Sequence, residues 1–108
     1  MLEALSLTGK IVVITGGGTG LGREMTLAMA KAGADLVIAA RRLAPIEEVA
    51  QQVRAIGRRA EAVPTDATDT ESVRLLFEYV IKEFGKVDIL FNNAGIVRED
   101  GPKPIWEI

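Results

Sequence analysis

Residues 10–22 read KIVVITGGGTGLG, a short apolar run that leads directly into a glycine-rich turn. The run at Lys10–Thr15 is rich in Val and Ile, which is typical of a strand buried on both faces. The next segment, Gly20–Ala32, carries a helical stripe, and Gly33 predicts its end. The apolar positions of that stripe are Leu21, Met25, Ala28, Met29 and Ala32. The stretch therefore predicts a strand, a tight turn and an amphipathic helix.

The alternation of strand and helix continues along the chain. Further strands are expected at Asp35–Ala40, Ala60–Thr65 and Val87–Phe91, and further helices at 45–56 and 68–84. Pro64 cannot donate a hydrogen bond to a neighbouring strand, which places it at a strand end or on an edge strand. Thr68 and Glu71 predict a capping box at the start of the third helix. Strands that alternate with helices pair in parallel, so we expect an α/β fold, a partial Rossmann-like doubly wound sheet of four strands in the order 3-2-1-4.

The composition excludes several classes of function. The 108 residues are 48% hydrophobic and 26% charged, as in one globular domain or part of one. A net charge of −2 offers no basic surface for nucleic acid or anionic lipid. Because the sequence has no Cys and no His, disulfides, thiolate nucleophiles and the usual zinc sites are excluded, and no metal is expected. With no secretory signal and no apolar run long enough to span a membrane, we expect a cytoplasmic location.

The glycine-rich turn is the main candidate for a binding site. Gly16, Gly20 and Gly22 follow the spacing G-x-x-x-G-x-G rather than the common dinucleotide fingerprint G-x-G-x-x-G. A glycine at the strand exit allows a tight turn, and one at the helix start lets the backbone approach a pyrophosphate. The positive end of the helix dipole then faces the phosphates. A turn without a ligand is the alternative, but the flanking strand and helix favour a dinucleotide cofactor.

The end of the second strand indicates which dinucleotide binds. Folds that bind NAD(H) place an acidic residue there for the ribose 2′-hydroxyl, and this chain has Ala40 instead. Arg41 and Arg42 follow, and a guanidinium can hold a 2′-phosphate. Two solvated arginines without a ligand are the alternative. The pattern favours NADP(H), with Arg41 ahead of Arg42 and NAD(H) as the second choice.

Polar residues also follow the third and fourth strands. Asp66 can accept a hydrogen bond from adenine, or it can cap the next helix, for which Thr68 and Asp69 are already present. The tetrapeptide at 92–95 reads NNAG, whose small residues let the backbone approach a cofactor and whose amides satisfy carbonyls and hydroxyls. Because the carboxyl ends of parallel strands meet at one edge of a sheet, we expect these residues beside the glycine-rich turn.

The chain carries three motifs in order: TGGGTGLG at 15–22, DATD at 66–69 and NNAG at 92–95. Together they resemble the amino-terminal half of the short-chain dehydrogenase/reductase family, over residues 6–97. The resemblance implies that Asn92 braces the sheet. The cofactor-binding residues that the sequence and the resemblance indicate are Gly16, Thr19, Gly20, Leu21, Gly22, Arg41, Arg42, Asp66, Ala67, Asn93, Ala94 and Gly95.

The family's catalytic Ser and Tyr-x-x-x-Lys lie well beyond residue 95, and the only tyrosine here, Tyr79, is followed four residues later by Glu83. The resemblance therefore implies that residues 1–108 are the NAD(P)-binding Rossmann domain of an oxidoreductase, in its amino-terminal part, without the substrate and catalytic region. It implies hydride transfer between NADP(H) and a small-molecule carbonyl or alcohol, in a parent protein that forms homo-oligomers.

Alone, the chain is expected to be inactive and to self-associate through an uncovered edge strand and the apolar helix face at 73–84. Two alternatives stay open at this point. One is a non-catalytic dinucleotide-binding module or regulator. The other, which the NNAG motif and the missing acid at position 40 disfavour, is an α/β methyltransferase.

Overall fold

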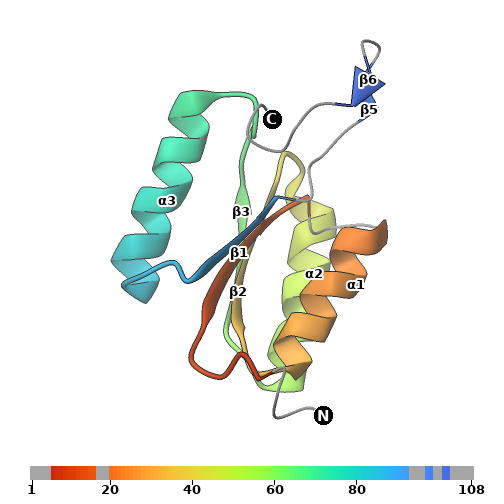
Figure 1. Cartoon of the computed structure of the whole chain (residues 1–108), viewed down its shortest axis with the longest axis vertical. Helices are drawn as coiled ribbons and strands as arrows, with labels where there is room; N and C mark the ends of the chain where they lie inside the picture. Colours follow the sequence, from red (N-terminus) through yellow and green to blue (C-terminus); the bar gives the residue numbers. More distant parts are fainter. Residues whose placement is uncertain (1–5, 17–19, 93–96, 99–100, 103–108) are drawn as a thin grey trace.

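The computed structural model describes residues 6–16, 20–92, 97–98 and 101–102. Strands and helices alternate along the chain as far as the fourth strand (Figure 1). The elements are β1 (Ile11–Thr15), α1 (Gly20–Lys31), β2 (Asp35–Ala40), α2 (Leu43–Ile56), β3 (Ala60–Pro64), α3 (Thr70–Phe84), β4 (Ile89–Asn92), β5 (Val97–Arg98) and β6 (Gly101–Pro102). None of the helices described is long and apolar enough to cross a membrane.

The first four strands form one parallel sheet in the order β3-β2-β1-β4, and β5 pairs with β6 in a separate antiparallel ribbon. Helices α1 and α2 lie on one face of the sheet and α3 lies on the other (Figure 1). β3 is at the edge and ends at Pro64, as the missing N–H of proline predicts. The predicted α/β class, the partial Rossmann-like sheet and its strand order are confirmed.

Strand β1 contributes side chains to both hydrophobic cores. Val12 and Ile14 pack with residues of α1 and α2, whereas Ile11 and Val13 pack with residues of α3. Val12, Val13 and Ile14 are 0% exposed. Full burial of one such side chain stabilises the fold by roughly 1.5–3 kcal/mol. The prediction of a strand buried on both faces is confirmed.

The buried face of α1 differs from the predicted stripe. The buried positions are Gly22, Thr26 and Ala30, whereas Leu21 is 68% exposed. Small residues let the helix lie close to its neighbours, and the buried Thr26 hydroxyl is satisfied because it donates to the Gly22 carbonyl oxygen at 2.8 Å. The predicted stripe is therefore wrong at Leu21 and Ala28, which are exposed because small residues occupy the closest contact, whereas Met29 packs against the core as predicted.

The start of α3 also differs from the prediction. Its N-cap is Asp69, whose side chain accepts a hydrogen bond from the Glu71 backbone N–H at 3.0 Å. The Thr68 hydroxyl donates to Asp66 instead. The predicted capping box of Thr68 and Glu71 is therefore wrong, because Asp69, one residue later, supplies an equally suitable cap while Thr68 is engaged elsewhere.

Strand β4 begins at Ile89 rather than at Val87, because a side chain makes the preceding contact with β1. The Ile11 backbone N–H donates to Oδ2 of Asp88 at 2.8 Å, and the Asp88 backbone N–H donates to the Ile11 carbonyl oxygen at 2.9 Å. The bond from Ile11 is the main cause that lowers the pKa of the Asp88 carboxyl, and Lys86 lowers it further. Just before β4, Asp88 and Ile11 thus exchange two hydrogen bonds, and the Asp88 carboxylate replaces a backbone carbonyl as one of the acceptors.

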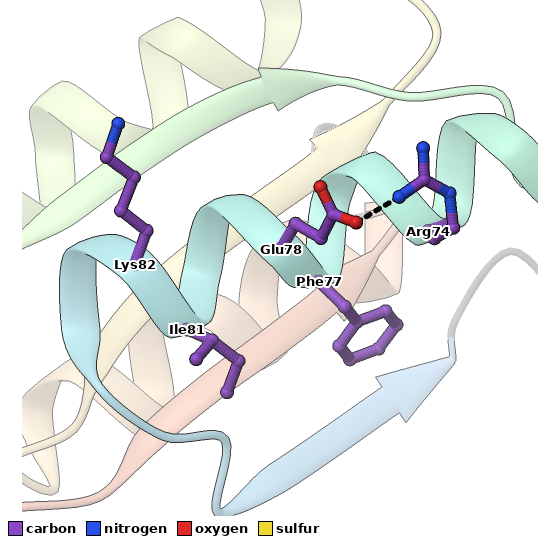
Figure 2. A pocket seen from close by; sticks show the side chains of 5 residues that line it. All are labelled: Arg74, Phe77, Glu78, Ile81 and Lys82. Atoms are coloured by element: carbon purple, nitrogen blue, oxygen red, sulfur yellow. Dashed lines mark hydrogen bonds and ion pairs between the residues drawn. The ribbon is translucent and has the colours of Figure 1, made fainter.

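The outer side of α3 and β4 exposes apolar surface. Within the described part of the chain, β4 pairs with β1 alone. Leu90, which pairs with Val13 and so lies on the α3 side of the sheet, is 53% exposed, and Ile81 is 51% exposed. Figure 2 shows Phe77 and Ile81 extending from the same side of α3. They line a hollow together with Arg74, Glu78 and Lys82.

We expect the isolated chain to self-associate through this side. Leu90→Lys should shift the chain toward monomer, because a charge on an exposed edge strand opposes pairing with another chain. Sedimentation velocity over a range of protein concentrations measures the effect. Ala28→Lys places the same charge on an exposed position of α1, across the sheet, and should leave the association unchanged. A wild-type chain that stays monomeric at every concentration would contradict the prediction.

Candidate functional site

The carboxyl ends of the four parallel strands bring the predicted residues to one edge of the sheet. Gly16 follows β1, Arg41 follows β2, Asp66 lies just beyond β3, and Asn92 is the last residue of β4. Open α/β sheets bind their ligands at this edge, beside the strand from which the chain continues in both directions. Here that strand is β1, with β2 and β3 added on one side and β4 on the other. Residues that are far apart in the sequence therefore converge on one region.

The turn after β1 depends on glycine conformations. Gly16 has a φ of 73° and Gly20 has a φ of 55°, which is the left-handed region that L side chains rarely adopt. The Gly16 N–H donates to the Ala39 carbonyl oxygen at 2.8 Å, so the first residue of the turn is held by β2. Thr19 lies outside the described residues. The two described ends of the turn show why glycine is needed at both positions.

The start of α1 is suited to an anion. Its first turn contains no acidic residue, so none of its side chains neutralises the positive end of the helix dipole. Gly22 is buried in this turn, and Leu21 projects into solvent beside it. The helix therefore presents backbone N–H groups and a partial positive charge at the edge where the strands end.

Arg41 and Asp66 form an ion pair across the ends of two neighbouring strands. The distance from Arg41 Nη2 to Asp66 Oδ1 is 3.4 Å. The β2–β3 register explains the contact, because Ala40 pairs with Pro64 and the Thr65 N–H donates to the Ala40 carbonyl oxygen at 2.7 Å. Two residues that the sequence analysis selected separately are thus in direct contact.

Arg42 lies at the start of α2 and does not share the contact that Arg41 makes with Asp66. It is the N-cap of α2, with an extended backbone and no hydrogen bond from its side chain to the helix end. It is exposed, and among the residues described no carboxylate lies within ion-pair distance of it. Arg41 therefore differs from Arg42 in having a partner within the candidate site.

The Asp66 carboxylate is held by Thr68. Asp66 Oδ1 accepts from the Thr68 hydroxyl at 2.6 Å and from the Thr68 backbone N–H at 2.9 Å. These two bonds lower the pKa of the Asp66 carboxyl, and Arg41 lowers it further, so the group is ionised near neutral pH. The Asp66 backbone N–H donates to Ser72 Oγ at 2.9 Å, a contact that no sequence pattern indicated. Ala67, the next predicted residue, is half-buried.

Asn92 connects β4 to β1 at the same edge. The Thr15 hydroxyl donates to Asn92 Oδ1 at 2.8 Å. The two residues are also paired in the strand register, so the side-chain bond extends the ladder at its end. No role was predicted for Thr15, which lies directly before the glycine-rich turn. Asn93, Ala94 and Gly95 lie outside the described residues.

Comparisons with known proteins identify the family to which the chain is similar. A family model described as short chain dehydrogenase matches residues 10–107. An uncharacterized oxidoreductase of Mycobacterium tuberculosis is 45% identical over 95 residues, which cover 88% of this chain and 36% of the relative. A crystal structure of a short-chain type dehydrogenase/reductase from Mycobacterium marinum is 37% identical with a TM-score of 0.84, over 90% of this chain and 39% of the other.

A second solved structure is similar and holds a cofactor. It is an NAD+-bound xylitol dehydrogenase, which is 32% identical with a TM-score of 0.80, over 83% of this chain and 35% of the other. The chain thus spans well under half the length of each of these proteins.

The contact between Thr15 and Asn92 gives a prediction about stability. Thr15→Val keeps the shape of the side chain but removes the hydroxyl donor, so it should lower the free energy of unfolding by about 1 kcal/mol. Urea denaturation measures the change. Thr70→Val, at an exposed position of α3, is the matched control and should change stability by less than about 0.5 kcal/mol. Equal effects of the two substitutions would show that the bond does not stabilise the strand ends.

Proposed function

Because this chain belongs to the short-chain dehydrogenase family, we propose that it is the cofactor-binding part of an NADP(H)-dependent oxidoreductase. The proposed reaction transfers a hydride between the nicotinamide and a small carbonyl or alcohol substrate. The observation that carries the proposal is the arrangement at the strand ends, where the glycine turn, the start of α1 and the Arg41–Asp66 pair lie at one edge of the sheet.

The residues present fit a dinucleotide cofactor. The left-handed glycines and the start of α1 would hold the pyrophosphate, Arg41 the 2′-phosphate and Asp66 the adenine. The nicotinamide, when bound, supplies or accepts the hydride. The further residues proposed to contact the cofactor are Thr19, Leu21, Arg42, Ala67, Asn93, Ala94 and Gly95.

The preference for NADP(H) is the finer part of the proposal. It is supported by Ala40, which provides no acceptor for a ribose 2′-hydroxyl, and by Arg41, whose charged donors suit a phosphate. NAD(H) is the competing cofactor, and the similar xylitol dehydrogenase is NAD+-bound. A direct comparison of the two cofactors therefore tests this part of the proposal separately from dinucleotide binding itself.

Catalysis is proposed for the parent protein and not for residues 1–108. The family's catalytic Ser and Tyr-x-x-x-Lys lie beyond the segment that residues 6–97 resemble, and Tyr79 has Glu83 in place of the lysine. On this view the chain is one amino-terminal domain, and its substrate region and homo-oligomer contacts belong to the rest of the protein.

Binding of NADP+ should be tighter than binding of NAD+ by about tenfold, the lower end of what a hydrogen bond to a charged group contributes. Isothermal titration of both cofactors at fixed ionic strength measures the ratio. The double change Ala40→Asp with Arg41→Ala should reverse the order, because it provides a hydroxyl acceptor and removes the phosphate partner. Tighter binding of NAD+ to the wild-type chain would refute the NADP(H) preference.

A control separates this preference from dinucleotide binding. Gly22→Val should weaken both cofactors, since Gly22 is buried in the first turn of α1 and a branched side chain would displace the helix start. Circular dichroism of the variant reports whether its secondary structure is retained. A folded Gly22→Val variant with undiminished binding would mean that the glycine-rich turn is not a cofactor site.

The isolated chain should bind cofactor without hydride transfer. Hydride transfer to a carbonyl needs a group that donates a proton to the reacting oxygen, and the sequence has no His, no Cys and no Tyr-x-x-x-Lys. The test is NADPH oxidation with a panel of aldehydes and ketones, followed by its near-ultraviolet absorbance. Measurable turnover by residues 1–108 would contradict the prediction.

A further inference from the structure

The two members of the Arg41–Asp66 pair are held to different extents. Asp66 Oδ1 accepts two hydrogen bonds from Thr68, at 2.6 and 2.9 Å, which fix the position of the carboxylate. The Arg41 side chain is 70% exposed, and its contact with Asp66 is an ion pair at 3.4 Å without a close hydrogen bond. The pair therefore consists of a fixed negative charge and a long side chain that can reorient.

The charges around Arg41 are unevenly distributed. Within the described ranges, Asp66 is the carboxylate that lies within ion-pair distance of Arg41. The neighbouring Arg42 adds a second positive charge, and Ala40 adds none. A 2′-phosphate that approached Arg41 would therefore meet one guanidinium that already faces an anion. Two anions close to one guanidinium repel each other and divide its donors.

We propose that Asp66 is a specificity-determining residue, whose carboxylate competes with the cofactor's 2′-phosphate for Arg41 and so limits the preference for NADP(H) over NAD(H). This inference rests on the proposed function. In this role Asp66 disfavours the 2′-phosphate, which only NADP(H) carries. Any contact of Asp66 with adenine is common to both cofactors. Its charge therefore narrows the difference in affinity between the two cofactors.

The ratio of the two dissociation constants isolates this effect. Adenine, ribose and pyrophosphate are common to NAD+ and NADP+, so a change in Asp66 that alters those contacts affects both cofactors and cancels in the ratio. What does not cancel is the interaction of the Asp66 charge with the 2′-phosphate, directly or through Arg41. The measured quantity is therefore Kd for NAD+ divided by Kd for NADP+.

Asp66→Asn is the informative substitution. Asparagine keeps the side-chain oxygen that accepts from Thr68, and it removes the charge. We expect the ratio to rise about two- to fivefold, the size of effect that an exposed ion pair produces. Asp66→Ser, which is also neutral and can form the same kind of turn, should raise it in the same direction and guards against misfolding of one variant. Glu48→Gln removes a charge from an exposed position of α2 and should leave the ratio unchanged.

Isothermal titration of NAD+ and NADP+ into the wild type and the three variants, at one ionic strength, gives distinct outcomes. A higher ratio in both Asp66 variants supports the inference. An unchanged ratio overturns it while the proposed function stands. A lower ratio also overturns it, because Asp66 would then position Arg41 for the phosphate. If neither cofactor binds to the wild-type chain, the proposed function fails together with the inference.

Discussion

The hydrogen bonding of β1 to a strand on each of its edges determines where the other elements lie. β2 and β4 pair with it in parallel, and its side chains are buried alternately against α1 and α2 or against α3. The pairing continues into the following turn, since the Gly16 N–H donates to the Ala39 carbonyl oxygen. The first residue of the glycine-rich turn is therefore held by the sheet.

The strands were predictable because short runs of Val and Ile are stable only where a sheet is covered on both faces. Their order followed from the handedness of parallel crossovers. The buried side of α1 was not predictable in the same way. Gly22 and Thr26 are buried there while Leu21 is exposed, because the distance between a helix and its neighbours depends on tertiary packing. The start of β4 likewise depends on Asp88, which contacts a residue 77 positions earlier.

The place of the candidate site was predictable from the strand ends, but the contacts within it were not. Arg41 and Asp66 were each assigned to a strand end, and their contact depends on the register between β2 and β3, which local sequence does not specify. Thr68 was assigned to the helix cap, and its bond to Asp66 depends on which neighbouring residue caps α3. The roles of Thr19 and of residues 93–95 stay predictions, since these residues lie outside the described part of the chain.

Polar contacts hold β4 against β1 at both ends of their pairing, through Asp88 with Ile11 and through Asn92 with Thr15. Each contact joins residues 77 positions apart, so closing this loop is the step with the largest entropic cost, and we expect β4 to join the sheet late in folding. A slip of one residue would turn Ile89 to the opposite face and would break both contacts. The two contacts therefore specify the register between β1 and β4, the strand pairing that closes the longest loop.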